Sequence, residues 1–224
     1  MVKVKKCLIC QNSINESINL LNLFNQSQNI CRSCQLNLTF NHNVRRCTKC
    51  LKILSEDEHE CLDCMWLSQS YKLINQLHTL YDYQTFIKTL MHQYKFSGDL
   101  ALYEIFQIPR KIIKNYDLIV PAPINDNKLR NRTFDHVAYV LDKQNIPYTQ
   151  LFQTEERKKQ ACLSKKERSE QNNPFKLIDE INLENKKILL VDDIYTTGLT
   201  LHQMAEHLFV RKIRKLDALT FARG

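Results

Sequence analysis

The sequence predicts an α/β protein with a parallel sheet flanked by helices and a small N-terminal module held together by metal. Three observations lead to this class. Short apolar runs at residues 117–120, 188–191 and 216–221 have the composition of buried strands. Helical patterns alternate with these runs, as the crossover connections of a parallel sheet require. Four Cys-x-x-C pairs fall within the first 64 residues.

The eight paired cysteines predict two structural zinc sites. Disulfides are disfavoured because cytosolic thiols stay reduced, and a thioredoxin-type redox motif would occur once rather than four times. Cys-x-x-C pairs bring sulfur ligands to a tetrahedral Zn²⁺, and a closed four-cysteine site leaves no open position for catalysis. Because the loops are short, we expect the first pair to join the second and the third to join the fourth. The expected ligands are Cys7, Cys10, Cys31, Cys34, Cys47, Cys50, Cys61 and Cys64.

Metal binding changes how the nearby histidines and the net charge are interpreted. His42 and His59 lie close to the cysteine pairs, but eight thiolates saturate two ions, so both are expected at the surface. The formal charge of +8 counts the cysteines as neutral, whereas eight thiolates and two Zn²⁺ would lower it to about +4. The basic composition is therefore a weak argument for nucleic-acid binding.

Composition excludes several other classes. No run approaches 18 apolar residues, and residues 1–6 are not followed by a sustained apolar stretch, so neither a membrane span nor a secretory signal is expected. We therefore expect a cytoplasmic protein. The chain contains three glycines, and no glycine-rich nucleotide-binding motif can be formed from them.

The chain divides into three predicted segments. Residues 1–66 form a double zinc-ribbon module, which is too small to fold on an apolar core. Residues 67–115 show mainly helical patterns with a turn between Tyr81 and Tyr83, and are expected to connect the module to the core and pack on it. Residues 116–224 form the main α/β domain.

The main domain is expected to contain five strands. Residues 148–152 and 175–178 have strand-like patterns in addition to the three runs above. Helices are expected at residues 133–145 and 200–211. The polar, charged residues 153–174 are expected to form a long loop.

Residues 188–200 carry the strongest functional signal. Four aliphatic residues precede Asp192 and Asp193, which we expect to emerge where the strand ends. Hydroxyl residues around Gly198 then lead into a helix whose N-terminus is suited to bind an anion. Carboxylates beside an anion site at the carboxyl edge of a parallel sheet fit ribose 5-phosphate. The alternative is an ordinary polar turn between a strand and a capped helix.

This segment resembles the signature of type I phosphoribosyltransferases, which bind phosphoribosyl pyrophosphate (PRPP). The resemblance implies that Asp192 and Asp193 are the catalytic carboxylates that hold the ribose hydroxyls, while the following loop wraps the 5′-phosphate. It also implies Mg²⁺ bound together with PRPP. The PRPP-binding residues would be Asp192, Asp193, Ile194, Tyr195, Thr196, Thr197, Gly198, Leu199 and Thr200.

The order of the motifs resembles the ComF family (ComFC and GntX-like proteins) of competence-associated proteins, which join a zinc-ribbon module to a phosphoribosyltransferase-like domain. The resemblance covers nearly the whole chain and includes residues 94–99 and 117–123. Where the family commonly has Arg-Gly-Phe-Asn, residues 132–135 read Arg-Thr-Phe-Asp, so the local turn departs from the pattern. Arg130 and Arg132 are candidates to contact pyrophosphate, and a solvated helix start is the alternative.

Two other basic features near these motifs are open to more than one interpretation. The basic loop at residues 153–174 could clamp pyrophosphate, contact DNA phosphates or be a charged surface loop. Lys95 stands among apolar and aromatic residues and is expected to be structural.

The resemblance implies two candidate functions. The first is a late competence protein that acts in the cytoplasm in the uptake and handling of single-stranded DNA during natural transformation, with PRPP as ligand. Its partners would be single-stranded DNA and a DNA-uptake helicase or other competence proteins. The second is an active phosphoribosyltransferase that transfers ribose 5-phosphate to an unidentified base or related acceptor. No acceptor-binding segment or general base is recognisable, which favours binding over transfer.

Single-strand binding predicts aromatic side chains that stack on bases. The candidates are Trp66, Tyr71, Tyr81 and Tyr83. Aromatic residues in helical patterns more often belong to the core, which is the alternative for all four.

Overall fold

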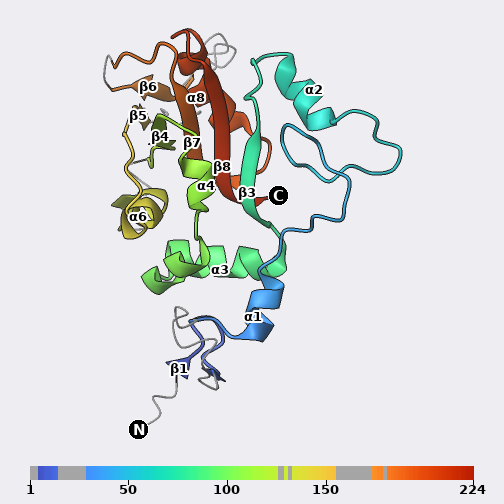
Figure 1. The fold of residues 1–224 in the computed structure, drawn as a ribbon, viewed down its shortest axis with the longest axis vertical. Helices are drawn as coiled ribbons and strands as arrows, with labels where there is room; N and C mark the ends of the chain where they lie inside the picture. Colours follow the sequence, from blue (N-terminus) through green and yellow to red (C-terminus); the bar gives the residue numbers. More distant parts are fainter. Residues whose placement is uncertain (1–4, 15–28, 126–128, 131–132, 155–172, 179–180) are drawn as a thin grey trace, which may run out of the picture.

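The computed structural model describes residues 5–14, 29–125, 129–130, 133–154, 173–178 and 181–224 (Figure 1). Its centre is a four-stranded sheet in the order β3-β8-β7-β4, and every pair of neighbouring strands is parallel. The strands are β3 (Leu77–Asp82), β4 (Leu118–Pro121), β7 (Lys187–Tyr195) and β8 (Lys215–Arg223). The predicted α/β class with a parallel sheet is confirmed.

Both faces of the sheet are covered, because successive side chains of a strand point to opposite faces. Ile188 and Leu190 pack in one core with the apolar side of helix α8 (Leu199–Phe209). Leu189 and Val191 pack in a second core. That second core is completed by α3 (Thr85–Phe96), the 3-10 helix η1 (Leu100–Ile105) and α6 (His136–Lys143).

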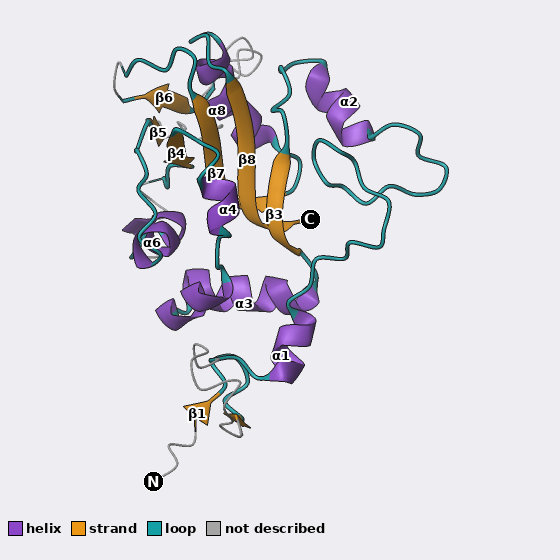
Figure 2. Ribbon diagram, in the orientation of Figure 1, coloured by secondary structure: helices purple, strands orange, loops and turns teal. Residues whose placement is uncertain are grey.

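Helix α3 lies across the end of the sheet at which the parallel strands finish (Figure 2). Strand β3 runs almost directly into it, and the Tyr83 amide donates a 2.8 Å hydrogen bond to the Arg223 carbonyl at the end of β8. After η1, the short helix α4 (Arg110–Ile113) leads back to the start of β4. The carboxyl ends of the strands therefore face the side of α3.

The predicted set of five strands in one sheet is wrong in two respects. Strand β3 lies in the segment expected to be helical and pairs with β8 from Leu77↔Ala218 to Asp82↔Arg223. It is an edge strand, so partly exposed polar residues such as His78 and Thr79 interrupt its apolar pattern. The expected strands at 148–152 and 175–178 are instead the three-residue strands β5 (Phe152–Thr154) and β6 (Phe175–Leu177), which form a separate antiparallel pair.

The helices and the strand close to residues 188–200 agree better with the sequence-based predictions. Helices α6 and α8 overlap the helices predicted at residues 133–145 and 200–211. Strand β7 is longer than the predicted strand at residues 188–191, because its pairing with β8 continues to Tyr195↔Arg223. Within the described residues, no helix is both long and apolar enough to cross a bilayer.

The N-terminal residues form only short elements. These are β1 (Lys5–Lys6), β2 (Ser13–Ile14), α1 (Arg32–Asn37) and α2 (Leu62–Ser68). In Figure 1, β1 and α1 lie on the far side of α3 from the sheet, whereas α2 and the loops before it lie beside β3. The N-terminal residues therefore contact the core at two separate places.

A buried ion pair joins the second of these places to the sheet. Nη2 of Arg46 lies 2.8 Å from a carboxylate oxygen of Asp82, at the end of β3, and both side chains are less than 10% exposed. The Leu77 amide also donates to the Lys49 carbonyl at 2.8 Å. The division into segments 1–66, 67–115 and 116–224 remains a prediction, but contacts of this kind cross its first boundary.

Candidate functional site

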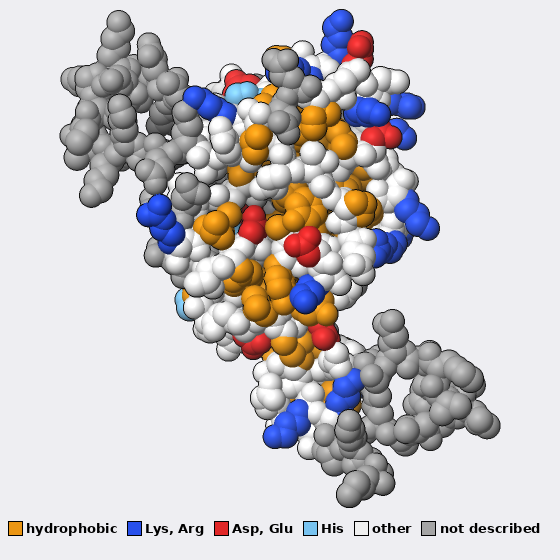
Figure 3. Space-filling view, turned by 90° about the vertical axis from the view of Figure 1, so that its left-hand side faces the viewer, with side chains coloured by type: hydrophobic (Ala, Val, Ile, Leu, Met, Phe, Trp, Pro, Cys, Tyr) orange, Lys and Arg blue, Asp and Glu red, His pale blue; other side chains and the backbone are white. Residues whose placement is uncertain are grey.

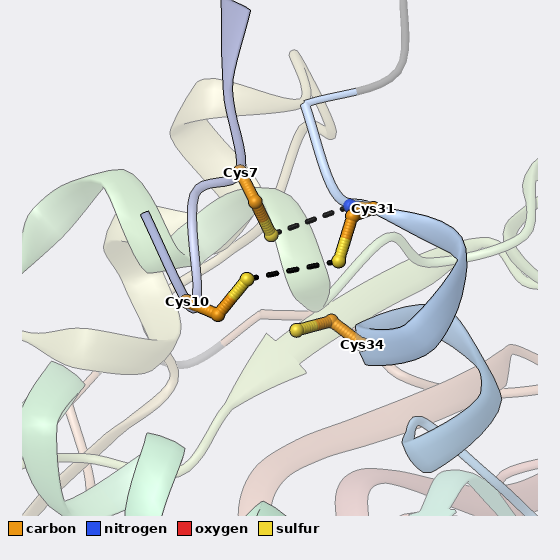
Figure 4. A group of neighbouring side chains, drawn as sticks. All are labelled: Cys7, Cys10, Cys31 and Cys34. Carbon is orange, nitrogen blue, oxygen red and sulfur yellow. Dashed lines mark hydrogen bonds between the residues drawn. The ribbon is translucent and has the colours of Figure 1, made fainter. Parts of the chain in front are cut away.

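The first cysteine cluster is built from Cys7, Cys10, Cys31 and Cys34. Their side chains point toward one another from the loop after β1 and from the start of α1 (Figure 4). The Cys31 amide donates to the sulfur of Cys7 at 3.3 Å, and the sulfurs of Cys10 and Cys31 are 3.7 Å apart. The cluster packs beside the core that contains α3, through neighbouring residues such as Leu8 and Ile30.

The second cluster is built from Cys47, Cys50, Cys61 and Cys64. It is more deeply integrated than the first, because Cys47, Cys50 and Cys61 belong to the same buried core as Leu190 and α8. The pairing of the four Cys-x-x-C motifs is therefore first with second and third with fourth, as expected. His42 and His59 are exposed and belong to neither cluster.

The geometry of both clusters fits a tetrahedral metal site. All ligand atoms within a cluster lie within 4.8 Å of one another. In the second cluster the sulfurs of Cys50 and Cys61 are 3.5 Å apart, and those of Cys47 and Cys64 are 3.7 Å apart. Four sulfurs at about 2.3 Å from a Zn²⁺ lie about 3.8 Å apart, whereas a disulfide needs about 2.05 Å. Two four-cysteine sites could therefore each hold a zinc ion.

Hydrogen bonding favours the thiolate form at one ligand of each cluster. In the second cluster, hydrogen bonding with Cys64 outweighs burial and, together with the Lys52 amide and Arg223, lowers the pKa of Cys50 to about 5. In the first cluster, burial raises the pKa of Cys7, but backbone hydrogen bonds outweigh it and lower the pKa to about 6. Thiolates are the form that binds zinc.

The two acids of the functional signal lie within β7 rather than beyond its end. Asp192 pairs with Thr220 of β8, and the ladder continues through Ile194. The expectation that the strand stops at residue 191 is therefore wrong, because parallel pairing with β8 extends the strand past the aliphatic run. Both carboxylates are half-buried, and one oxygen of Asp192 accepts a 2.8 Å hydrogen bond from the Asp193 amide.

Asp193 has two basic partners that come from different helices. Nζ of Lys95, near the end of α3, lies 2.5 Å from Oδ2 of Asp193. Nε2 of His136, the first residue of α6, lies 2.6 Å from the same oxygen. Lys95 and His136 are both buried, whereas the Asp193 side chain is still 18% exposed, so the cluster is only partly accessible to water. Lys95 is therefore not merely structural, as the sequence suggested, but part of the carboxylate site.

The cluster keeps Asp193 ionised. Burial raises the pKa of Asp193, but the hydrogen bond from His136 and the charge of Lys95 outweigh burial and hold the pKa below its usual range. His136 is in turn held by its helix: the Asp135 side chain caps α6 by accepting from the Val137 and Ala138 amides at 3.0 Å. The carboxylate is thus fixed in both charge and orientation.

The loop between β7 and α8 is a short turn that leads directly into the N-terminus of the helix. Thr196 and Thr197 are exposed, and the hydroxyl of Thr197 accepts from the Leu199 amide at 3.4 Å. Gly198, at the N-cap of α8, has a φ of 80°, a left-handed conformation that favours glycine. Leu199 and Thr200 form the first turn of the helix, whose exposed amides can bind an anion.

Gly198 is also required by close packing. A Cβ atom placed on this glycine would overlap the hydroxyl of Tyr195 and lie 2.9 Å from its Cε1. The Tyr195 ring is 1% exposed, so it has little room to move away. The Tyr195 ring therefore supports the loop from the core side and does not face a ligand.

The remaining predicted contacts lie partly outside the described residues. Arg130 is exposed, and no ion pair joins it to Asp192 or Asp193 in the described part of the chain. Arg132 and most of the basic loop, residues 155–172, are not among the described residues. Thr133, which stands where the family commonly has glycine, has a φ of 65°. The turn therefore keeps the left-handed conformation without the glycine.

A cavity of about 600 Å³ adjoins the carboxylate site along one side of α3. It is lined by Tyr83, Lys88, His92, Lys95 and Phe96, among others. Lys95 thus belongs both to the cavity wall and to the cluster around Asp193. The rings of His92 and Phe96 are 4.9 Å apart, so this wall combines aromatic and cationic side chains.

Comparison with known proteins supports this description. Residues 133–223 match the phosphoribosyl transferase domain family. The chain is 28% identical to competence protein ComFC of Streptococcus pneumoniae, over 89% of this chain and 91% of that protein. It is 24% identical to ComFC of Bacillus subtilis, over 97% of this chain and 95% of that protein. These sequence matches confirm the resemblance to the ComF family and the phosphoribosyltransferase-like character of the C-terminal domain.

A solved structure is also similar in part. A hypoxanthine-guanine phosphoribosyltransferase from Bacillus anthracis aligns with 59% of this chain and 68% of its own, at 20% identity and a TM-score of 0.30. At that score the alignment adds nothing to the sequence matches.

Replacing Gly198 by alanine should damage the loop more than the same change at Gly98. Both glycines have a positive φ, but only at Gly198 would the new Cβ meet another side chain. We expect Gly98→Ala to cost about 1 kcal/mol through backbone strain alone, and Gly198→Ala to cost at least twice that. Urea unfolding of the two variants measures the difference, and equal losses would contradict the close packing on Tyr195.

The ion pairs of Asp193 should make stability depend on pH in the acid range. Because the pKa of Asp193 is lowered on folding, its contribution is fully present above the ordinary carboxyl pKa and is lost as the pH falls through the folded value. At neutral pH, Asp193→Asn should lower the free energy of unfolding by about 3 kcal/mol. The gap to wild type should shrink below about pH 4. Asp57→Asn, at an exposed loop position, is the control and should follow the wild type throughout.

Proposed function

We propose, from the confirmed resemblance to the ComF competence proteins, that this chain is a competence-associated protein whose C-terminal domain binds PRPP. The observation that carries the proposal is the continuity of the site along the chain. Asp192 and Asp193 lie near the carboxyl end of β7, and the anion-binding turn and the start of α8 follow within a few residues. Sugar hydroxyls and the 5′-phosphate of one ligand can therefore be bound together.

In this proposal, different residues contact the ribose and the 5′-phosphate of PRPP. Asp192 and Asp193 hold the ribose hydroxyls, and the loop from Thr196 to Thr200 surrounds the 5′-phosphate, while the buried Tyr195 supports that loop. Lys95 and His136 keep the Asp193 carboxylate ionised and hold its Oδ2 in place. Mg²⁺ bound with PRPP would offset the charge of the pyrophosphate. Arg130 and Arg132 remain candidates for contacts with that group.

Transfer of the ribose 5-phosphate to an acceptor is the second candidate, and the cavity beside Lys95 is the observation in its favour. A volume of about 600 Å³ is within the usual range of small-molecule sites. The aromatic and cationic residues in its wall suit a flat, polar ring such as a base. If the protein is a transferase, the acceptor would bind in this cavity, close to the Asp193 carboxylate that holds the ribose.

The proposed cellular role is in the cytoplasmic handling of single-stranded DNA during natural transformation, with other competence proteins as partners. Among the four aromatic candidates, Trp66 supports this role best, because it is 54% exposed on α2. The hydroxyl of Tyr81 is instead bonded to the Ile105 carbonyl. On the face in Figure 3, the described lysines and arginines lie at separate places. Stacking of bases on exposed aromatic side chains such as Trp66 is the proposed mode of contact.

The wild-type protein should bind PRPP more tightly with Mg²⁺ than without it. Isothermal titration with PRPP measures this, and no binding at millimolar concentration (about 4 kcal/mol or less) would overturn the proposal. The double variant Asp192→Asn/Asp193→Asn should bind at least tenfold more weakly, because two carboxylate acceptors for the ribose hydroxyls are lost. Asp57→Asn again serves as the control.

The same variants separate binding from transfer and from the cellular role. Pyrophosphate released from PRPP in the presence of a panel of bases would establish transfer, and binding without release would favour a ligand-binding role. Transformation of a deletion strain that expresses the double variant shows whether PRPP binding is needed for DNA handling. Wild-type transformation would make the pocket dispensable for that role.

Each chain should bind two zinc ions. Cys10→Ser and Cys64→Ser should each lower the metal content to one ion per chain, because the two clusters use separate ligands. Inductively coupled plasma mass spectrometry of the purified proteins measures the content. One ion in the wild type would mean that half of the cysteines serve another purpose.

A further inference from the structure

We propose that Arg223 is a positioning residue that joins the second cysteine cluster to the loop between β7 and α8, so that this cluster, and not the first, supports the loop of the proposed PRPP site. The inference rests on the proposed function for its ligand. Its physical basis is a single buried guanidinium group that contacts both elements.

Arg223 is the last residue of β8 and is 5% exposed. A guanidinium cannot lose its charge in a protein, so a buried one needs hydrogen-bond partners on all sides. Its Nη1 donates to the carbonyls of Tyr195 and Thr196 at 3.3 and 3.1 Å. These two residues are the end of β7 and the start of the loop.

The other side of the same group contacts the second cluster. Nε of Arg223 donates to the Cys50 carbonyl at 2.7 Å, and Nη2 lies 3.8 Å from the sulfur of Cys50. Nη2 also lies 3.2 Å from a carboxylate oxygen of Asp63, the residue before Cys64. A four-thiolate zinc site carries a net negative charge, which the guanidinium offsets.

The contact to Tyr195 extends to the turn itself. The guanidinium carbon lies 5.0 Å from the centre of the Tyr195 ring, and that ring fills the space directly beneath Gly198. The order of contacts is therefore Cys50, Arg223, Tyr195 and Gly198. Displacing the Cys50 loop removes hydrogen bonds from Arg223, and Arg223 then holds Tyr195 and Thr196 less firmly.

The first cluster has no such connection in the described part of the chain. Its neighbours Leu8, Ile9 and Ile30 pack beside the core of α3 and η1, on the other face of the sheet from α8. Asn29 is hydrogen-bonded to Glu104 of η1. The protein thus contains its own control, a second four-cysteine site that does not touch the loop.

The test compares full-length variants by metal content, PRPP affinity and hydrogen–deuterium exchange. Arg223→Lys keeps the positive charge but cannot reach both elements, so we expect two zinc ions and about tenfold weaker binding of Mg²⁺–PRPP. Cys64→Ser should lose one zinc and weaken PRPP binding at least as much. Cys10→Ser should lose one zinc and bind PRPP within about twofold of the wild type.

Exchange without ligand tests the inference separately from PRPP binding. In Arg223→Lys, amide exchange should rise in a peptide that covers residues 195–201, while peptides from β4 and α6 remain protected. Asp63→Asn, a milder change at a partly exposed position, should produce a smaller rise in the same peptide. If the wild type fails to bind PRPP but this local rise occurs, the proposed function fails and the connection stands.

Three results would overturn the inference. The first is wild-type exchange of residues 195–201 in both Arg223→Lys and Asp63→Asn. The second is an equal effect of Cys10→Ser and Cys64→Ser on that peptide. The third is a rise in amide exchange across the whole protein in both Arg223→Lys and Asp63→Asn. Such a rise would indicate general destabilisation instead of local positioning.

Discussion

The parallel pairing of β7 with β8 is the constraint on which the rest of the structure depends. It extends β7 past its aliphatic run, from Lys187↔Lys215 to Tyr195↔Arg223. The aliphatic half of the ladder is buried on both faces and anchors two cores. The polar half carries Asp192 and Asp193 on one strand and Arg223 on the other. Because parallel strands end at the same edge, a single ladder supplies both the stable centre and the charged groups.

Each buried charge at this edge is held by partners that come from other elements. Asp193 is held by Lys95 and His136, Arg223 by carbonyls and Asp63, and Asp82 by Arg46. Burying an unpaired charge is strongly unfavourable, so these contacts are requirements of the fold as well as features of the site. The same pairs fix the directions of the side chains. A site built in this way is organised before any ligand arrives, which reduces the entropic cost of binding.

The two cysteine clusters have different structural roles. Both stand in a region whose helices and strands are too short to be stable alone. The first joins β1 to α1 beside α3, and the second replaces part of the apolar core beside α8. Metal binding in the second cluster would therefore be coupled to the packing of the main domain. The boundary at residue 66 separates sequence motifs more clearly than it separates cores.

The sequence by itself determined the features that are encoded locally. The spacing of Cys-x-x-C pairs indicated two four-cysteine clusters and their pairing, and residues 188–200 indicated the strand, turn and helix of the site. The turn was predictable because Asp192, Gly198 and Thr200 are neighbours in the chain. Only the tertiary structure decided the partners of those residues. His136 is 57 positions from Asp193, and Arg223 is 173 positions from Cys50. Periodicity and motif spacing cannot reveal contacts between residues so far apart in the chain. The edge strand β3 was not predicted because its strand conformation depends on pairing with β8.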